Sequence, residues 1–171
     1  MKKLYLLRHA QSQPSFDIAD KDRTLTDHGK KEATSLGTYM SKNNIIPDQI
    51  ICSTAIRTRK TLDSLKQSIK TDNINFSDSI YNASTGDILK EIQNTADDIK
   101  SLLIIGHNPA IHATGQLIAP NGDKEAIHKH TIAYPPNTLT IIDCPTDKWS
   151  DIQPSINIMT EYIETKDHYN T

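Results

Sequence analysis

Short apolar runs alternate along the chain with segments of helical periodicity, and this alternation limits the possible folds more than any other feature of the sequence. Runs rich in apolar residues lie at 4–7, 49–52, 74–76 and 102–105. Between them, apolar residues recur at spacings of three and four, as in helices that bury one face. Repeated strand–helix–strand units are typical of a mostly parallel sheet with helices on both faces. The sequence therefore predicts a three-layer α/β/α sandwich.

Capping residues indicate where the helices begin. Thr26 is suited to cap a first helix, and the apolar spacing predicts a second helix over 55–69 and a third from about Thr85. A fourth helix is expected directly after the run at 102–105. Asn108 would be its N-cap and Pro109 its first residue, a position that tolerates proline because no N–H is needed there.

The pattern becomes weaker after Pro120. Runs at 139–142 and 156–163 are interpreted as further strands, which would add an antiparallel edge to the sheet. The segment His128-Lys129-His130 is polar and without clear periodicity, so it is interpreted as surface. The chain has no internal repeat, and its 171 residues predict a single domain over 1–171.

Composition and charge exclude several classes of protein. The chain has 19 Lys and Arg against 21 Asp and Glu, a net charge of −2, which argues against a polycationic nucleic-acid binder. The apolar runs are far shorter than the ~20 residues of a membrane span, and the first one stops at Arg8, too early for a signal peptide. Cys52 and Cys144 lack metal-ligand spacing and are interpreted as buried, reduced thiols. A cytoplasmic protein is therefore expected.

Polar side chains follow directly after three of the predicted strands. Arg8 and His9 follow the first strand, Ser53 and Arg57 the second, and His107 the strand at 102–105. Because the carboxyl ends of parallel strands share one edge of a sheet, these side chains should lie together. Guanidinium groups and helix N-termini both bind phosphate oxygens. The predicted ligand is a phosphoryl group.

The histidines in this set indicate a chemistry as well as a ligand. A neutral imidazole is nucleophilic near pH 7 and can carry a phosphoryl group covalently. Nearby arginines would keep it neutral and would stabilise the charged oxygens of an in-line transition state, without a metal. Each residue alone is more often structural, and only their joint placement favours a site. His107 and His112 lie about 140° apart around a helix, which argues against a metal-binding pair.

Four segments of the sequence together resemble the histidine phosphatase superfamily, and within it the small SixA-like phosphohistidine phosphatases. The similarity extends in order and spacing over roughly residues 3–118. It implies a phosphoglycerate mutase-like fold. The segments are LYLLRHA from Leu4, RTLTDHG from Arg23, STAIRTRKT from Ser53 and LLIIGHNPAI from Leu102.

The resemblance also implies roles for individual residues. His9 would be the nucleophile that becomes phosphorylated, and Arg23 would be a further phosphate-binding residue typical of the SixA-like branch. Ser12 is a second candidate for substrate binding. The remaining catalytic residues, which would hold the phosphoryl oxygens, are Arg8, Arg57 and His107.

The sequence departs from the family pattern in two places. Ala10 stands where the superfamily usually has glycine, a small change. The segment 80–84, Ile-Tyr-Asn-Ala-Ser, has no carboxylate where many members place a general acid. Asp87 and Glu91 on the next helix are candidate acids, although helix-dipole complementation and solvent exposure are the simpler interpretation.

The missing acid favours cleavage of P–N over P–O bonds. An alkoxide leaving group has a conjugate acid of pKa ~15.7, whereas imidazole has one of ~6.5. The difference of ~9 units is worth about 12 kcal/mol of leaving-group basicity, part of which an acid would offset. The sequence therefore favours phosphohistidine as the substrate.

These observations predict a phosphatase that needs neither a metal nor a cofactor. Its expected substrate is a phosphorylated partner protein. The family-level expectation for that partner is a histidine-containing phosphotransfer domain of a signalling relay. No long insertion is present to form a lid, so an open pocket is expected. Two alternatives remain open: a phosphatase of small phosphomonoesters, and a non-catalytic phosphate- or phosphoprotein-binding module, which would not need His9. The sequence makes no prediction of the oligomeric state.

Overall fold

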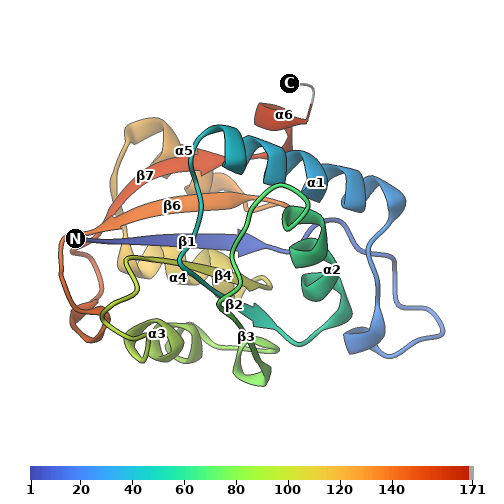
Figure 1. Cartoon of the computed structure of the whole chain (residues 1–171), viewed down its shortest axis with the longest axis horizontal. Helices are drawn as coiled ribbons and strands as arrows, with labels where there is room; N and C mark the ends of the chain where they lie inside the picture. Colours follow the sequence, from blue (N-terminus) through green and yellow to red (C-terminus); the bar gives the residue numbers. More distant parts are fainter. Residues whose placement is uncertain (170–171) are drawn as a thin grey trace.

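A seven-stranded sheet runs through the structure, a computed structural model that describes residues 1–169 (Figure 1). The strands are β1 (Lys2–Arg8), β2 (Gln49–Ser53), β3 (Ile74–Ser77), β4 (Ser101–Gly106), β5 (Asn121–Gly122), β6 (Leu139–Cys144) and β7 (Ile158–Ile163). The α-helices are α1 (Asp27–Lys42), α2 (Ile56–Leu65), α3 (Thr85–Gln93), α4 (Ala110–Ile118), α5 (Lys124–Ile132) and α6 (Thr165–His168). Short 3₁₀ turns are η1 (Asp20–Asp22), η2 (Asp78–Ile80) and η3 (Trp149–Asp151).

The strand order is β3-β2-β4-β1-β6-β7-β5. Strands β3, β2, β4 and β1 pair in parallel, whereas β6 runs antiparallel to both β1 and β7. The mostly parallel sheet expected from the sequence is thereby confirmed. The antiparallel pairing lies in the C-terminal third as expected, and β7 and β5 extend the sheet beyond β6.

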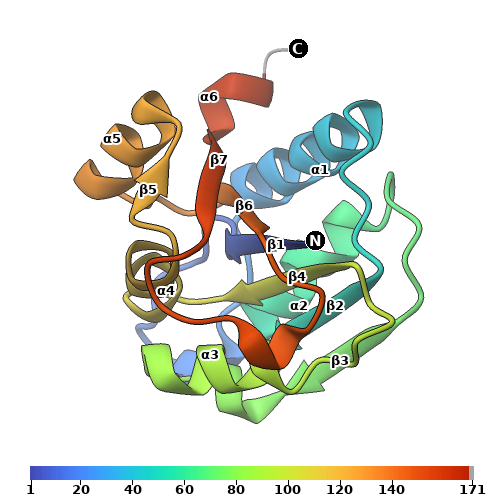
Figure 2. The same ribbon diagram turned by 90° about the vertical axis from the view of Figure 1, so that its left-hand side faces the viewer.

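Helices cover both faces of the sheet, because successive residues of each central strand point to opposite sides. On β1, Leu4 and Leu6 pack in the core under α3 and α4, whereas Tyr5 and Leu7 pack under α1 and α2. Figure 2 shows the two layers on opposite sides of the strands. This arrangement buries central strands on both faces, which explains their continuous apolar runs.

The first two predicted helices form, and the second differs from expectation mainly at its C-terminal boundary. Thr26 caps α1 as predicted, with its Oγ1 accepting from the Gly29 N–H at 2.9 Å. The second helix is shorter than the predicted range 55–69 and ends at Leu65. The apolar spacing continues beyond it because Ile69, in the following turn, is buried in the same core.

The predicted cap of the fourth helix is wrong. Helix α4 begins at Ala110, with Pro109 in the N-cap position and no side-chain cap. The side chain of Asn108 is used elsewhere, since its Nδ2 donates to the carbonyl oxygen of Tyr134 at 2.9 Å. Asn108 therefore forms a long-range hydrogen bond with Tyr134 instead of the helix cap that the local sequence predicts.

The segment after Pro120 contains structure that the weak pattern did not predict. Strand β5 and helix α5 lie there, and Asp123 caps α5 by accepting from the Ala126 N–H at 2.9 Å. The interpretation of His130 as a surface residue is wrong: the side chain is 1% exposed. Its ring packs against Tyr134 and Tyr162. Because α5 buries this polar residue where most helices bury an apolar one, its sequence shows little apolar periodicity.

Two further expectations concern the cysteines and the membrane. Cys52 and Cys144 are both buried free thiols, as predicted, and burial raises the pKa of each to about 12. Among the helices of residues 1–169, none combines the length and the apolar character that a membrane crossing requires.

Candidate active site

His9 lies directly after β1, at the carboxyl end of the parallel strands, with only 7% of its surface exposed. Its Nδ1 is 2.7 Å from the carbonyl oxygen of Ala10. A carbonyl oxygen can only accept a hydrogen bond, so Nδ1 carries the proton and Nε2 of a neutral ring keeps a free lone pair. Local backbone geometry thereby sets the tautomer that a nucleophile needs.

The surroundings of His9 also keep its ring neutral. Burial lowers the pKa of His9 to about 4, the hydrogen bond to Ala10 opposes this change, and the charges of Arg57, Arg8 and Arg23 add to it. At neutral pH the ring is therefore unprotonated at Nε2 and can attack an electrophile.

A cavity of about 350 Å³ opens above His9 and gathers the predicted residues. Arg8 is anchored by its Nη1, which donates to the carbonyl oxygen of Tyr134 at 2.9 Å, while its Nε is buried with no hydrogen-bond partner among residues 1–169. Arg57, in the first turn of α2, is also buried. The lining residues are Arg8, His9, Gln11, Ser12, Arg23, Arg57, His107, Asn108 and Pro136.

His107 follows β4, and its ring centroid lies 5.3 Å from that of His9. Its Nε2 is 2.8 Å from Ser53 Oγ, which itself accepts from the Ala55 N–H at 3.4 Å. When the Ser53 hydroxyl donates to Nε2, the His107 proton resides on Nδ1. Nδ1 is buried and has no partner among the described residues, so in that tautomer it offers an N–H donor for a ligand oxygen.

The charge state of His107 supports the same role. Burial lowers the pKa of His107 to about 3, with His9 and Arg57 adding to the effect and Asp20 opposing it. His107 is therefore a neutral donor near pH 7 and does not compete with the arginines as a cation.

Arg23 and Ser12 are brought to the same pocket by the loop that precedes α1. Arg23 Nη2 donates to Ser12 Oγ at 2.9 Å, and its Nε donates to the carbonyl oxygen of Gln13 at 2.7 Å. Ser12 forms an isolated β-bridge with Leu25, which holds the two ends of this loop together. Ser12 thus contacts Arg23 directly and lines the cavity with it.

The sequence prediction missed four residues of the site: Gln11, Asn108 and Pro136, which line the cavity, and Asp20, which holds its arginines. Asp20 Oδ1 accepts from Arg23 Nη1 at 3.0 Å, and Oδ2 accepts from Arg57 Nη2 at 3.2 Å and from the Tyr81 hydroxyl at 2.7 Å. Its main-chain oxygen accepts from Arg57 Nη1 at 2.8 Å. The hydrogen bond from Tyr81, followed by that from Arg23, lowers the pKa of Asp20 to about 2, so the carboxylate is ionised.

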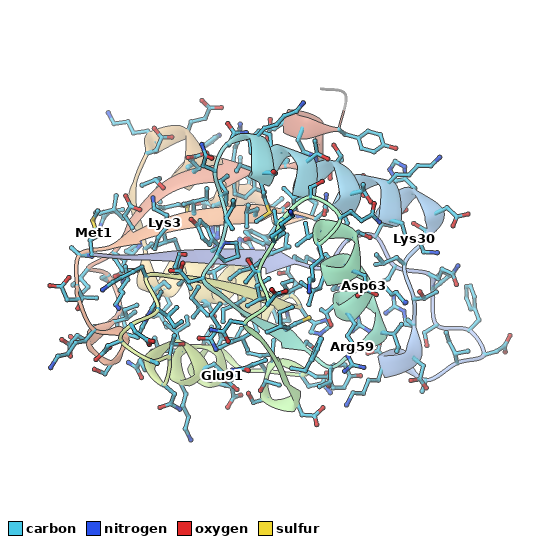
Figure 3. The ribbon with its side chains drawn as sticks, in the orientation of Figure 1. Met1, Lys3, Lys30, Arg59, Asp63 and Glu91 are labelled. Atoms are coloured by element: carbon cyan, nitrogen blue, oxygen red, sulfur yellow. The ribbon has the colours of Figure 1, made fainter. Side chains whose placement is uncertain are left out.

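The two candidate acids on α3 lie elsewhere. Asp87 forms a capping box with Ser84, whose N–H donates to its Oδ2 at 2.8 Å. Glu91 accepts from Ser77 Oγ at 2.6 Å and from the hydroxyl of Ser79. Neither carboxylate lines the cavity. Figure 3 marks Glu91 on α3, and Arg59 on α2, whose guanidinium lies 4.4 Å over the exposed ring of Phe76 as a surface charge.

No group of three or more His, Cys, Asp or Glu side chains suited to a metal is found within residues 1–169. His112 is not paired with His107, because its Nε2 donates to the carbonyl oxygen of His130 at 2.6 Å. The chemistry that this arrangement supports is the binding of an anion with several oxygens next to a neutral imidazole nucleophile.

Comparison with known proteins gives a consistent result. Residues 4–88, which include Arg8, His9, Arg23 and Arg57, match the family model of the histidine phosphatase superfamily (branch 1). An uncharacterised protein of Mycobacterium tuberculosis is 29% identical over 150 residues, which cover 86% of this chain and 92% of that protein.

Two solved structures share the fold over nearly the whole chain. A candidate phosphohistidine phosphatase SixA from Nakamurella multipartitia superposes with a TM-score of 0.83 and 26% identity, covering 95% of each chain. Its counterpart from Agrobacterium tumefaciens has a TM-score of 0.79 and 25% identity, covering 95% of this chain and 98% of that one. These findings confirm the expected family and fold: the chain belongs to the histidine phosphatase superfamily, where it resembles the SixA-like phosphatases.

Proposed function

We propose that this phosphatase hydrolyses phosphohistidine on a partner protein through a covalent phosphoryl intermediate on His9. The observation that carries the proposal is the hydrogen bond from His9 Nδ1 to the Ala10 carbonyl oxygen, which leaves Nε2 free beneath the arginines of the pocket. A module that only bound phosphate would need the arginines but would have no use for an oriented, neutral imidazole.

In the first step, Nε2 of His9 attacks phosphorus in line with the bond to the substrate histidine. That P–N bond breaks, and its electron pair returns to the substrate ring. Arg8, Arg57 and Arg23, with the Nδ1–H of His107, bind the phosphoryl oxygens and stabilise their charge in the transition state. No metal is required for this transfer.

In the second step, water attacks the phosphoryl group on His9 and phosphate is released. Because His9 keeps the proton on Nδ1 throughout, its phosphorylated ring is a cation that leaves as neutral imidazole. The contact with Ala10 therefore supports both steps, since it orients the nucleophile and improves the same ring as a leaving group.

The proton balance of the pocket favours a P–N substrate. Among residues 1–169, no carboxylate lines the cavity, and Asp20 at its border is ionised because its pKa is lowered to about 2. A protonated acid that could deliver a proton to a departing alkoxide is thus not available at neutral pH. Imidazole needs much less assistance because it is a far weaker base.

A protein substrate is supported by the surroundings of the pocket. The loop that carries Ser12 and Arg23 also exposes Phe16 and Ile18, two apolar side chains suited to contact with another protein. We propose one domain without an inserted lid, whose pocket accepts a side chain protruding from a partner such as a histidine-containing phosphotransfer domain. The two free cysteines are in keeping with a cytoplasmic location.

The test is to trap the intermediate. The protein is mixed with a phosphohistidine-bearing phosphotransfer domain labelled on phosphorus, or with a panel of phosphomonoesters, and is quenched in alkali. We expect label on His9, located by peptide mass spectrometry, and faster turnover of the P–N substrate. His9→Ala should lose both label and turnover, while the exposed His28→Ala, on α1, should behave like the wild type. Full activity of His9→Ala, or equal turnover of alkyl phosphates, would contradict the proposal.

A further inference from the structure

The hydrogen bonds of Asp20 leave one acceptor position on its carboxylate open. An ionised carboxylate has about four lone-pair positions, two on each oxygen. Arg57 Nη2 and the Tyr81 hydroxyl use both positions on Oδ2, whereas Arg23 Nη1 alone bonds to Oδ1. Oδ1 can therefore accept one more hydrogen bond without any rearrangement of the groups that hold it.

Asp20 borders the pocket through the arginines that line it, and its side chain reaches solvent. His9 is 7% exposed, whereas the side chain of Asp20 is 48% exposed. Arg57 connects them, because it lines the cavity and donates to Asp20 through both Nη atoms. The carboxylate is thus one guanidinium group away from the place where the phosphoryl oxygens would bind.

The geometry of in-line transfer directs the leaving group towards solvent. The group that departs must lie opposite the attacking Nε2 of His9, and a side chain from a partner protein enters from the mouth. The leaving imidazole would therefore lie towards solvent, where the exposed carboxylate of Asp20, held by Arg23 and Arg57, is the candidate to meet it.

We propose that Asp20 is a specificity-determining residue, which accepts a hydrogen bond from the second ring nitrogen of the substrate phosphohistidine. The inference rests on the proposed function and adds to it the group that recognises the leaving ring. When the nitrogen not bonded to phosphorus carries a proton, the ring is a cation and its N–H can donate to Oδ1. The P–N bond then breaks, its electrons return to the ring, and the ring departs as neutral imidazole with that N–H intact.

The same carboxylate disfavours phosphate esters. Cleavage of a P–O bond in a pocket without an acid releases an oxyanion, which a nearby negative charge repels. The groups that face Asp20 are Tyr81, Arg23, Arg57 and His107, of which Tyr81 first and then the two arginines keep the carboxylate ionised. A single fixed anion can thus attract one class of leaving group and repel the other.

The experiment compares Asp20→Asn with the wild type on two substrates, a phosphohistidine peptide and p-nitrophenyl phosphate. We expect kcat/KM for the peptide to fall about tenfold or more, the effect of losing one hydrogen bond between charged groups. For p-nitrophenyl phosphate, kcat/KM should fall by a much smaller factor, because weaker contacts with Arg23 and Arg57 act on both substrates, whereas loss of the hydrogen bond to the ring acts on the peptide alone. Retained turnover of p-nitrophenyl phosphate also reports that the variant is folded. Asp22→Asn is the matched control, because Asp22 is an exposed carboxylate in the same turn η1 and should leave both values unchanged.

A second readout separates recognition of the ring from a merely structural role. At saturating peptide, the alkaline limb of kcat reports deprotonation of the bound substrate ring, and it should move to lower pH in Asp20→Asn. An equal change on both substrates, or no change on either, would overturn the role of Asp20. A wild type that cleaves p-nitrophenyl phosphate but not the peptide would instead overturn the proposed function itself.

Discussion

The hydroxyl of Ser53, at the end of β2, lies 2.8 Å from Nε2 of His107, at the end of β4. Ser53 is fully buried, and its oxygen also accepts from the N–H of Ala55. When its hydroxyl donates to Nε2, the proton of His107 resides on Nδ1. The contact between Ser53 and His107 is a consequence of the pairing of two parallel strands and not of nearness in the sequence.

Ser53→Ala should reduce turnover by about tenfold, because the free energy of one hydrogen bond then no longer favours the tautomer with the proton on Nδ1. Without the hydroxyl donor, His107 can place its proton on Nε2 and then presents a lone pair, instead of an N–H, to a phosphoryl oxygen. Steady-state kinetics should show the loss mainly in kcat, because the donor acts on the transition state. Ser64→Ala on α2 is the control, because the hydroxyl of Ser64 donates to the carbonyl oxygen of Lys60. An equal loss in that variant would refute the argument.

Arg57→Ala should weaken phosphate binding and turnover together. Arg57 is 6% exposed and lines the pocket, whereas Arg59, two residues later on α2, is exposed and lies over Phe76. Hydrogen bonds to charged groups are worth about 1.5–3 kcal/mol each, so we expect at least a tenfold rise in the inhibition constant of tungstate or phosphate. Arg59→Ala should leave that constant within about twofold; similar values for the two variants would show that Arg57 does not bind the anion.

The ring of His9 should remain neutral well into the acid range. Its pKa is lowered from 6.5 to about 4, chiefly by burial, so the unprotonated form predominates above about pH 4 and is lost only below it. NMR titration of the ring, assigned with His9→Ala, should show a midpoint near 4 and no change between pH 8 and 6. A midpoint at or above 6.5 would mean that burial and the arginines do not act on the nucleophile as described.

Protonation of the same ring should also lower stability in acid. The folded state binds a proton at His9 less readily than the unfolded state does, so the free energy of unfolding decreases as pH falls from about 6.5 towards 4. His130, whose pKa burial also lowers to about 4, acts in the same direction. Urea denaturation at several pH values should show this decrease, and a stability that rises on acidification would contradict it.

Gly115→Ala should destabilise the fold by about 1–3 kcal/mol. A Cβ on Gly115 would lie 2.5 Å from Nε2 of His130, which is buried and cannot move aside without disturbing Tyr134. Gly86→Ala on α3 is the matched control, because the nearest heavy atom to its added Cβ is Ser84 Oγ at 3.6 Å. Thermal denaturation should show a lower Tm for the first variant and an unchanged or higher Tm for the second, since alanine favours a helix.

Much of the candidate site could be predicted because its residues are tied to local patterns. Arg8, His9 and His107 each stand at or directly after the end of a buried strand, and Arg57 follows in the first turn of the next helix. Parallel strands bring their carboxyl ends to one edge, so residues at those positions must meet whatever the details of packing. The proposed nucleophile and most of its proposed anion-binding groups could therefore be located from the sequence.

The remaining features depend on contacts between distant segments. Asp17, Asp20 and Asp22 are equivalent carboxylates in the sequence of one loop, and only the fold brings Asp20 to Arg57, 37 residues away. In the same way, Tyr134 takes the side chain of Asn108 from its predicted cap. Periodicity and capping act over a few residues and determine the elements and the strand-end residues. The partners of polar side chains were decided by the tertiary structure, because a hydrogen bond depends on positions in space that local pattern does not specify.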